Sequence, residues 1–150
     1  MLTAEDIIKE KGGTIISVAP DTTIKETLKV MTENKIGGIL IKEEERFVGI
    51  WTERDLLRNS LVDGFDITVA KVGDYMVTDL EVAKHDTTIF NLMDIFLGRR
   101  LRHLPVENNG VFIGMLTIGD VIKANLNEKT KELESMNSVI NWDYYENWQW

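Results

Sequence analysis

The sequence contains no cysteine, which excludes a disulfide framework and any metal site built from thiolates. It also lacks a run of about 18 apolar residues, so no membrane-spanning helix is predicted. The first six residues, Met1–Asp6, have neither the basic start nor the apolar core of a signal peptide. We therefore expect a cytoplasmic protein.

The charge is unbalanced towards acid. The 150 residues include 25 Asp and Glu against 17 Lys and Arg, which gives a formal net charge of -8. A field of this sign repels nucleic acid and anionic lipid, so neither is an expected partner. The simplest use of the charge is a well-solvated surface. A hydrophobic content of 43% is that of an ordinary globular protein.

The usual catalytic patterns are missing as well. His85 and His103 are the only histidines, and no cluster of His and carboxylate residues has metal-ligand spacing. There is no Gly-x-Ser-x-Gly elbow, no phosphate-binding glycine loop and no dinucleotide Gly-x-Gly-x-x-Gly. We expect no metal, no required cofactor and no catalysis. A small nucleotide-processing enzyme, with an Asp or His103 as base, stays open as an alternative.

What the sequence does contain is an internal repeat. The residues Gly49–Asp55 recur 65 positions later as Gly114–Asp120. The same shift maps Asp21–Ile24 onto Asp86–Ile89 and Phe47 onto Phe112, in a gapless register over about forty residues. The chain therefore consists of two copies of one unit.

Each copy shows the pattern of strand, helix, strand, strand and helix. Thr23 with Glu26 fits a capping box ahead of an amphipathic helix. We expect the first strand of each copy at residues 14–18 and 80–82, and an N-terminal helix that ends at Gly12. The fold class is α/β (α+β), with two β-α-β-β-α repeats and an extended C-terminal helix.

These patterns divide the chain into four regions, the last of which is a C-terminal extension. The last helix continues its apolar stripe as far as Ile140, and residues 141–150 hold three of the four tryptophans. This aromatic tail is predicted to dock on its own domain, to mediate self-association or to bind another protein. The expected regions are 1–60 (first repeat with the N-terminal helix), 61–75 (linker), 76–126 (second repeat) and 127–150 (helix extension and tail).

The repeated motif is Gly-x-x-Thr-x-x-Asp at a strand-to-helix junction. One interpretation is structural: Thr52 caps the helix, and Asp55 in its first turn suits the helix dipole. A functional interpretation uses the same geometry, because a helix N-terminus binds phosphate and an acidic side chain accepts hydrogen bonds from ribose. The glycine would let a ligand approach the backbone. Both Thr and Asp persist in the second copy, as Thr117 and Asp120, which favours a shared ligand role.

Taken together, these features resemble a tandem pair of CBS domains, the modules named after cystathionine β-synthase. The resemblance rests on the two Gly-x-x-Thr-x-x-Asp segments, the two Asp-Thr-Thr-Ile helix starts, His103–Val106, and the Gly73–Thr78 lead-in. It implies repeats packed as a pseudo-twofold module whose clefts bind an adenosine ligand: AMP, ADP, ATP, S-adenosylmethionine or NAD. It also implies a homodimer.

The resemblance further assigns residues to parts of such a ligand. Asp55 and Asp120 would bind ribose, Thr52 and Thr117 phosphate, Arg54 a phosphate, His103 an unspecified part of the ligand, and Ile16, Ile39, Leu80 and Pro105 adenine. Because Gly119 stands where the first copy has Arg54, the two sites should differ. Trp51, an apolar residue within a strand, is expected in the core.

The function expected from this resemblance is regulatory. A ligand that binds one arrangement of the module better than another shifts the population towards it, and the change passes to an unidentified protein target. The alternative is a protein-interaction module with degenerate clefts that acts through the aromatic tail.

Overall fold

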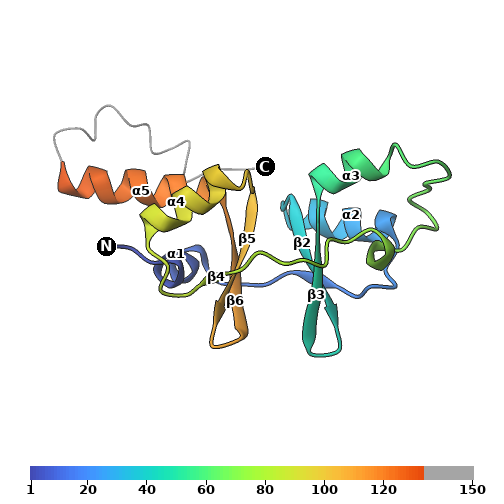
Figure 1. Cartoon of the computed structure of the whole chain (residues 1–150), viewed down its shortest axis with the longest axis horizontal. Coiled ribbons are helices and arrows are strands. Elements are labelled where there is room, and N and C mark those ends of the chain that lie inside the picture. Colours follow the sequence, from blue (N-terminus) through green and yellow to red (C-terminus); the bar gives the residue numbers. More distant parts are fainter. Residues whose placement is uncertain (134–150) are drawn as a thin grey trace. The chain divides into compact units, whose positions relative to one another are not determined.

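The structure, a computed structural model, describes residues 1–133 of the 150-residue chain. The chain divides into two compact units (Figure 1). One unit is contiguous and consists of residues 15–80. The other combines residues 1–14 with the described residues from 81 to 133. The C-terminal tail predicted to dock or associate lies outside the described residues.

The contiguous unit contains one three-stranded sheet. Its strands lie in the order β1-β2-β3, with β1 parallel to β2 and β2 antiparallel to β3. The helices α2 and α3 precede β2 and follow β3, as the sequence pattern predicts. The elements are β1 (Ser17–Val18), α2 (Ile24–Glu33), β2 (Gly38–Glu43), β3 (Arg46–Thr52), α3 (Glu53–Asn59) and the 3-10 helix η1 (Val72–Asp74).

The second unit repeats this sheet, with strand order β4-β5-β6. The bounds of α4, β5 and β6 follow those of α2, β2 and β3 at the 65-residue shift, and the register irregularity at Ile41/Lys42 recurs at Val106/Glu107. The repeat and the fold class are thus confirmed. The elements are α1 (Ala4–Lys11), β4 (Ala83–Lys84), α4 (Ile89–Gly98), β5 (His103–Asn108), β6 (Val111–Thr117) and α5 (Ile118–Glu132).

The first strands of the two repeats differ from the predicted ranges. β1 is only Ser17–Val18 rather than residues 14–18, and β4 is Ala83–Lys84 rather than residues 80–82. Each pairs with only two residues of its neighbour, in parallel. A β-branched or apolar run identifies a segment that is extended, but not how many of its residues pair with a neighbouring strand.

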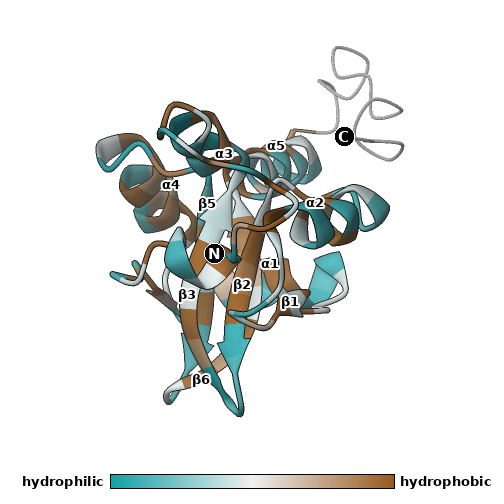
Figure 2. Ribbon diagram, turned by 90° about the vertical axis from the view of Figure 1, so that its right-hand side faces the viewer, coloured by the Kyte–Doolittle hydropathy of each residue, from teal (hydrophilic) through white to brown (hydrophobic). Residues whose placement is uncertain are grey.

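Each unit has its own hydrophobic core. Trp51 is fully buried in the first, as expected, and its indole Nε1 donates to Asn59 Oδ1 at 2.8 Å. The second repeat has the smaller Leu116 at the matching position. There a helix residue compensates, because Phe96 on α4 stands where α2 has Met31, and both are buried. The hydropathy colouring shows hydrophobic residues along the strands and hydrophilic ones towards the hairpin tips (Figure 2).

Helix α1 packs within the unit of the second repeat, although the sequence pattern groups it with the first. It contacts β6 and α5. The Ala4 N–H donates to the Thr87 carbonyl at 2.8 Å, and the Glu5 N–H donates to the His85 carbonyl at 2.9 Å. The segment before the first repeat therefore completes the unit that contains the second.

The linker makes the equivalent contacts with the first repeat. The Val72 N–H donates to the Thr22 carbonyl at 2.9 Å, and the Gly73 N–H donates to the Pro20 carbonyl at 2.8 Å. Thr22 and Pro20 lie 65 positions before the acceptors that α1 uses. Residues 2–8 and 70–76, which we call the two lead-ins, are thus structural counterparts, and each completes the repeat that it does not precede.

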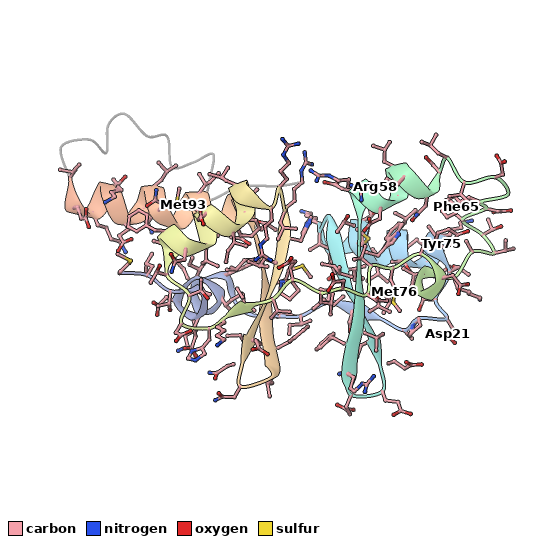
Figure 3. The ribbon with its side chains drawn as sticks, in the orientation of Figure 1. Asp21, Arg58, Phe65, Tyr75, Met76 and Met93 are labelled. Carbon is pink, nitrogen blue, oxygen red and sulfur yellow. The ribbon has the colours of Figure 1, made fainter. Side chains whose placement is uncertain are left out.

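A lead-in side chain packs over the repeated glycine in both units. A Cβ at Gly114 would lie 2.5 Å from Ile8 Cδ1, and one at Gly49 would lie 2.8 Å from Met76 Cγ (Figure 3 labels Met76). The expectation that these glycines admit a ligand to the backbone is therefore wrong. The space above each is filled by the protein's own core.

No helix within residues 1–133 is both long enough and apolar enough to cross a membrane.

We expect Gly114→Ala to lower the free energy of unfolding by about 1–3 kcal/mol, because the added methyl group overpacks against Ile8. The matched control is Gly98→Ala at the end of α4, where a Cβ meets nothing within 4 Å. There the change should stabilise by about 0.5–1 kcal/mol, the cost of a helical glycine. Urea denaturation of both variants measures the difference, and equal effects would contradict the lead-in packing.

Candidate functional site

The two Thr-x-x-Asp segments lie where the last strand of each repeat runs directly into a helix. Thr52 ends β3 and is the N-cap of α3, and Thr117 ends β6 and is the N-cap of α5. Both have extended backbone dihedral angles, as N-cap residues do. The hairpin thus delivers a hydroxyl and a carboxylate to the same end of each sheet.

In the first repeat Thr52 and Asp55 form a complete capping box, with hydrogen bonds in both directions. The Asp55 N–H donates to Thr52 Oγ1 at 3.4 Å, while the Thr52 N–H and hydroxyl donate to Asp55 Oδ2 at 2.9 and 3.1 Å. Asp55 is only 7% exposed. Its Oδ1 lies 3.6 Å from the guanidinium of Arg58, which is on the same helix (labelled in Figure 3).

The second repeat has the same box with a different cation. The Thr117 N–H donates to Asp120 Oδ2 at 2.8 Å, and the Asp120 N–H donates to Thr117 Oγ1 at 3.1 Å. Lys11, from the end of α1, places its ammonium 2.8 Å from Asp120 Oδ2 and 2.9 Å from the Met115 carbonyl oxygen. The capping interpretation is confirmed for both segments.

The chain contains a third Thr-x-x-Asp capping box, at the start of α1. The Thr3 N–H and hydroxyl each donate to Asp6 Oδ2 at 2.9 Å, and these bonds hold the pKa of the Asp6 carboxyl below its ordinary value. Asp6 is exposed and does not follow a hairpin. A capping box alone is therefore no mark of a binding site. Asp55 and Asp120 differ from Asp6 in lying at the end of a sheet with a basic side chain on the carboxylate.

Strand register decides which predicted residues share a sheet face with the second box. His103 pairs with Thr117, and Pro105 pairs with Met115. Because side chains alternate along a strand, these four lie on one face of the sheet. The structure therefore brings His103 and Pro105 to the same face as Thr117, with His103 directly beside it.

In the first repeat, Ile39 lies on the other face. It pairs with Trp51 and is fully buried in the core with it, so its side chain is not brought to Thr52. The residue that shares the face of Thr52 is Leu40, which pairs with Ile50. The 65-residue shift maps Leu40, and not Ile39, onto Pro105. Strict use of that shift would have found Leu40 from the sequence.

The remaining predicted residues lie around these junctions. Ile16 is half-buried just before β1 and packs against the first core. Leu80 is half-buried and precedes β4. Arg54 is the second residue of α3 and is partly exposed. Lys11 was not among the predicted residues: it is 109 positions from Asp120, and no local pattern connects the two.

Comparisons with known proteins agree on one family. A model of the CBS domain matches residues 4–62 and again residues 72–127. The mitochondrial CBS domain-containing protein CBSX3 of Arabidopsis thaliana is 33% identical over 151 residues, which cover 95% of this chain and 73% of CBSX3.

Solved structures agree with this match. A CBS-domain containing protein from Agrobacterium tumefaciens is 34% identical with a TM-score of 0.78, over 83% of this chain and 99% of that one. The crystal structure of CBSX2 in complex with AMP is 25% identical with a TM-score of 0.72, over 86% of this chain and 99% of that one.

We expect Thr52→Val and Thr117→Val each to lower the free energy of unfolding by about 1 kcal/mol, because valine cannot accept the capping hydrogen bond. Thr32→Val, at an exposed position of α2, is the control and should change stability by less than about 0.5 kcal/mol. Chemical denaturation gives all three values. If the cap variants matched the control, the caps would not contribute to stability.

Proposed function

The chain belongs to the CBS domain family, and from this premise we propose that it is an adenine-nucleotide-binding regulatory module with no catalysis of its own. The observation that carries the proposal is the duplicated Thr–Asp box at the end of each sheet. The AMP complex of the related CBSX2 supports the choice of ligand.

The proposed role of Asp55 and Asp120 is to bind ribose. An ionised carboxylate has about four acceptor positions on two oxygens. The capping bonds from the threonines all end on Oδ2, so both carboxylates retain acceptor capacity on Oδ1 for a ribose hydroxyl. The cap also fixes each carboxylate in place, which reduces the entropy lost when a ligand binds.

Phosphate binding is proposed to differ between the repeats. The first N–H of each helix is already bonded: Glu53 donates to the Gly37 carbonyl at 2.9 Å, and Ile118 donates to the Arg102 carbonyl at 3.2 Å. A phosphate therefore depends mainly on nearby cations, because the Thr52 hydroxyl already donates to Asp55 Oδ2 and would have to exchange that bond for one to the phosphate. We propose that Arg54 supplies a cation in the first repeat. The second has Gly119 at that position and must use another.

Adenine is proposed to lie on the sheet face that carries the threonine. In the second repeat this face offers Pro105, with His103 at its edge, and in the first it offers Leu40. Ile16 and Leu80 remain proposed neighbours of the base. A planar base gains most of its affinity from apolar contact. Ile16, Leu80 and His103 are partly exposed and open to such contact, whereas Leu40 and Pro105 are buried.

The output is proposed to be a population shift. Ligand favours one conformational or oligomeric state of the module, and a protein target responds to that state. A homodimer and a cytoplasmic location belong to the same proposal. The ligand class comprises AMP, ADP, ATP, S-adenosylmethionine and NAD, with AMP preferred because of CBSX2.

An interaction module is the second candidate function. The observation in its favour is the exposure of large apolar side chains around the end of α3, with Leu57 70% and Leu61 85% exposed. Exposed large apolar side chains are typical of protein contacts where they gather into a patch. On this view the boxes serve only as caps.

We expect a thermal-shift panel of the five ligands to stabilise the wild-type chain with at least one of them. Ligand at a hundred times its dissociation constant adds about 2.7 kcal/mol, or roughly 5–11 °C at this chain length. The shift should fall by about half or more in a chain carrying both Asp55→Ala and Asp120→Ala. No shift with any ligand, despite clean melting curves, would favour the interaction module.

We expect Asp120→Ala to weaken binding at the second site by about tenfold to a hundredfold, the loss of a charge-assisted hydrogen bond. Asp6→Ala is a matched control, because it opens the same kind of capping box away from any proposed site. Calorimetric titration of both variants separates the roles. Equal affinities would reduce Asp120 to a cap.

A further inference from the structure

Lys11 joins the end of α1 to the second capping box. Its ammonium is held by two acceptors, Asp120 Oδ2 at 2.8 Å and the Met115 carbonyl oxygen at 2.9 Å. The side chains of Lys11 and Asp120 are 41% and 22% exposed, so the pair is open to solvent on one side. The contact therefore places a cation beside the one group proposed to hold ribose in this repeat.

The docking of α1 does not depend on this contact. The start of the helix is held by the backbone bonds of Ala4 and Glu5, and Ile8 is buried against Gly114. An ion pair as exposed as Lys11–Asp120 adds little to stability. Lys11 lies at the opposite end of the helix from those backbone bonds, in the last turn, where a cation also suits the helix dipole.

The two groups together suit a vicinal diol. An ammonium has three N–H donors, and the two bonds to Asp120 and Met115 leave a third. A ribose hydroxyl is both donor and acceptor. It can donate to the Asp120 carboxylate and accept from Lys11 at once, because the two groups are within hydrogen-bond distance of each other.

We propose that Lys11 is a ligand-binding residue of the second site, which donates a hydrogen bond to a ribose hydroxyl held by Asp120. This assignment rests on the proposed function. It identifies the ribose as the part of the nucleotide that a residue of helix α1 contacts. It makes the second site selective for ligands with an intact 2′,3′-diol.

The first repeat has no equivalent. Its lead-in does not continue as a helix after Met76, because Val77 pairs with Ile50 on β3 through backbone bonds of 2.8 and 2.9 Å. The cation on Asp55 is Arg58, from the same helix and 68% exposed. The two sites therefore hold their carboxylates with different cations from different parts of the chain.

The test uses the full chain carrying Asp55→Ala, which leaves only the second site. AMP, ADP and ATP, each beside its 2′,3′-dideoxy counterpart, are titrated calorimetrically with and without Lys11→Met, which keeps the apolar stem. Lys9→Met is the control: it removes the same charge from the same helix, at a residue that pairs with Glu5 instead. Melting curves verify that each variant is folded.

We expect Lys11→Met to weaken the tightest-binding ribonucleotide about tenfold, and Lys9→Met to leave it unchanged. The dideoxy counterpart should bind weakly and be indifferent to Lys11→Met. An unchanged or increased affinity for the ribonucleotide would overturn the assignment, as would an equal penalty for the dideoxy ligand. These outcomes leave the proposed function intact. Wild-type chain that binds none of AMP, ADP, ATP, S-adenosylmethionine and NAD would overturn the proposed function, and the assignment with it.

Discussion

The packing of a lead-in against a repeated glycine is the contact on which both units depend. Ile8 fills the space above Gly114, and Met76 fills the space above Gly49. A Cβ at either position would crowd that side chain, so the glycine in the Gly-x-x-Thr-x-x-Asp motif serves the core. The same hairpin that receives the lead-in then runs directly into the capping box. Core packing and the geometry of the proposed ligand site are thus carried by one strand.

Asp55 and Asp120 differ from an ordinary helix-capping carboxylate because of the residues around them. Thr3–Asp6 shows that this chain uses the same box where only a helix start is needed. At the sheet ends, the box becomes a fixed carboxylate with a cation beside it, drawn from α3 in one repeat and from α1 in the other. The two repeats thus keep the same acceptor and differ in the donor.

Much of the fold was predictable because the repeat tests every local pattern twice. The ranges of α2 and α4, and of the two hairpins, follow from a single shift. The short parallel strands β1 and β4 were not predictable, because a strand of two residues leaves little signal in the sequence. Helix α1 has a clear apolar stripe. Such a stripe predicts that one face of a helix is buried, but it does not predict which part of the protein covers that face. The predicted Ile39 lies on the face opposite to Thr52, whereas Leu40 shares its face, because one residue is enough to change the face of a strand. The contact between Lys11 and Asp120 has no local signal at all.

The exchange of lead-ins also has a consequence for the order of folding. Residues 15–80 form a unit from one uninterrupted stretch, so this unit can assemble while the rest of the chain is still being synthesised. The other unit must bring residues 4 and 87 together, with the whole first repeat between them. Once that repeat has collapsed, the effective loop is shorter and its closure costs less entropy. Helix α1 can therefore dock only after β6 and α5 have been made, although it precedes the first repeat in the chain.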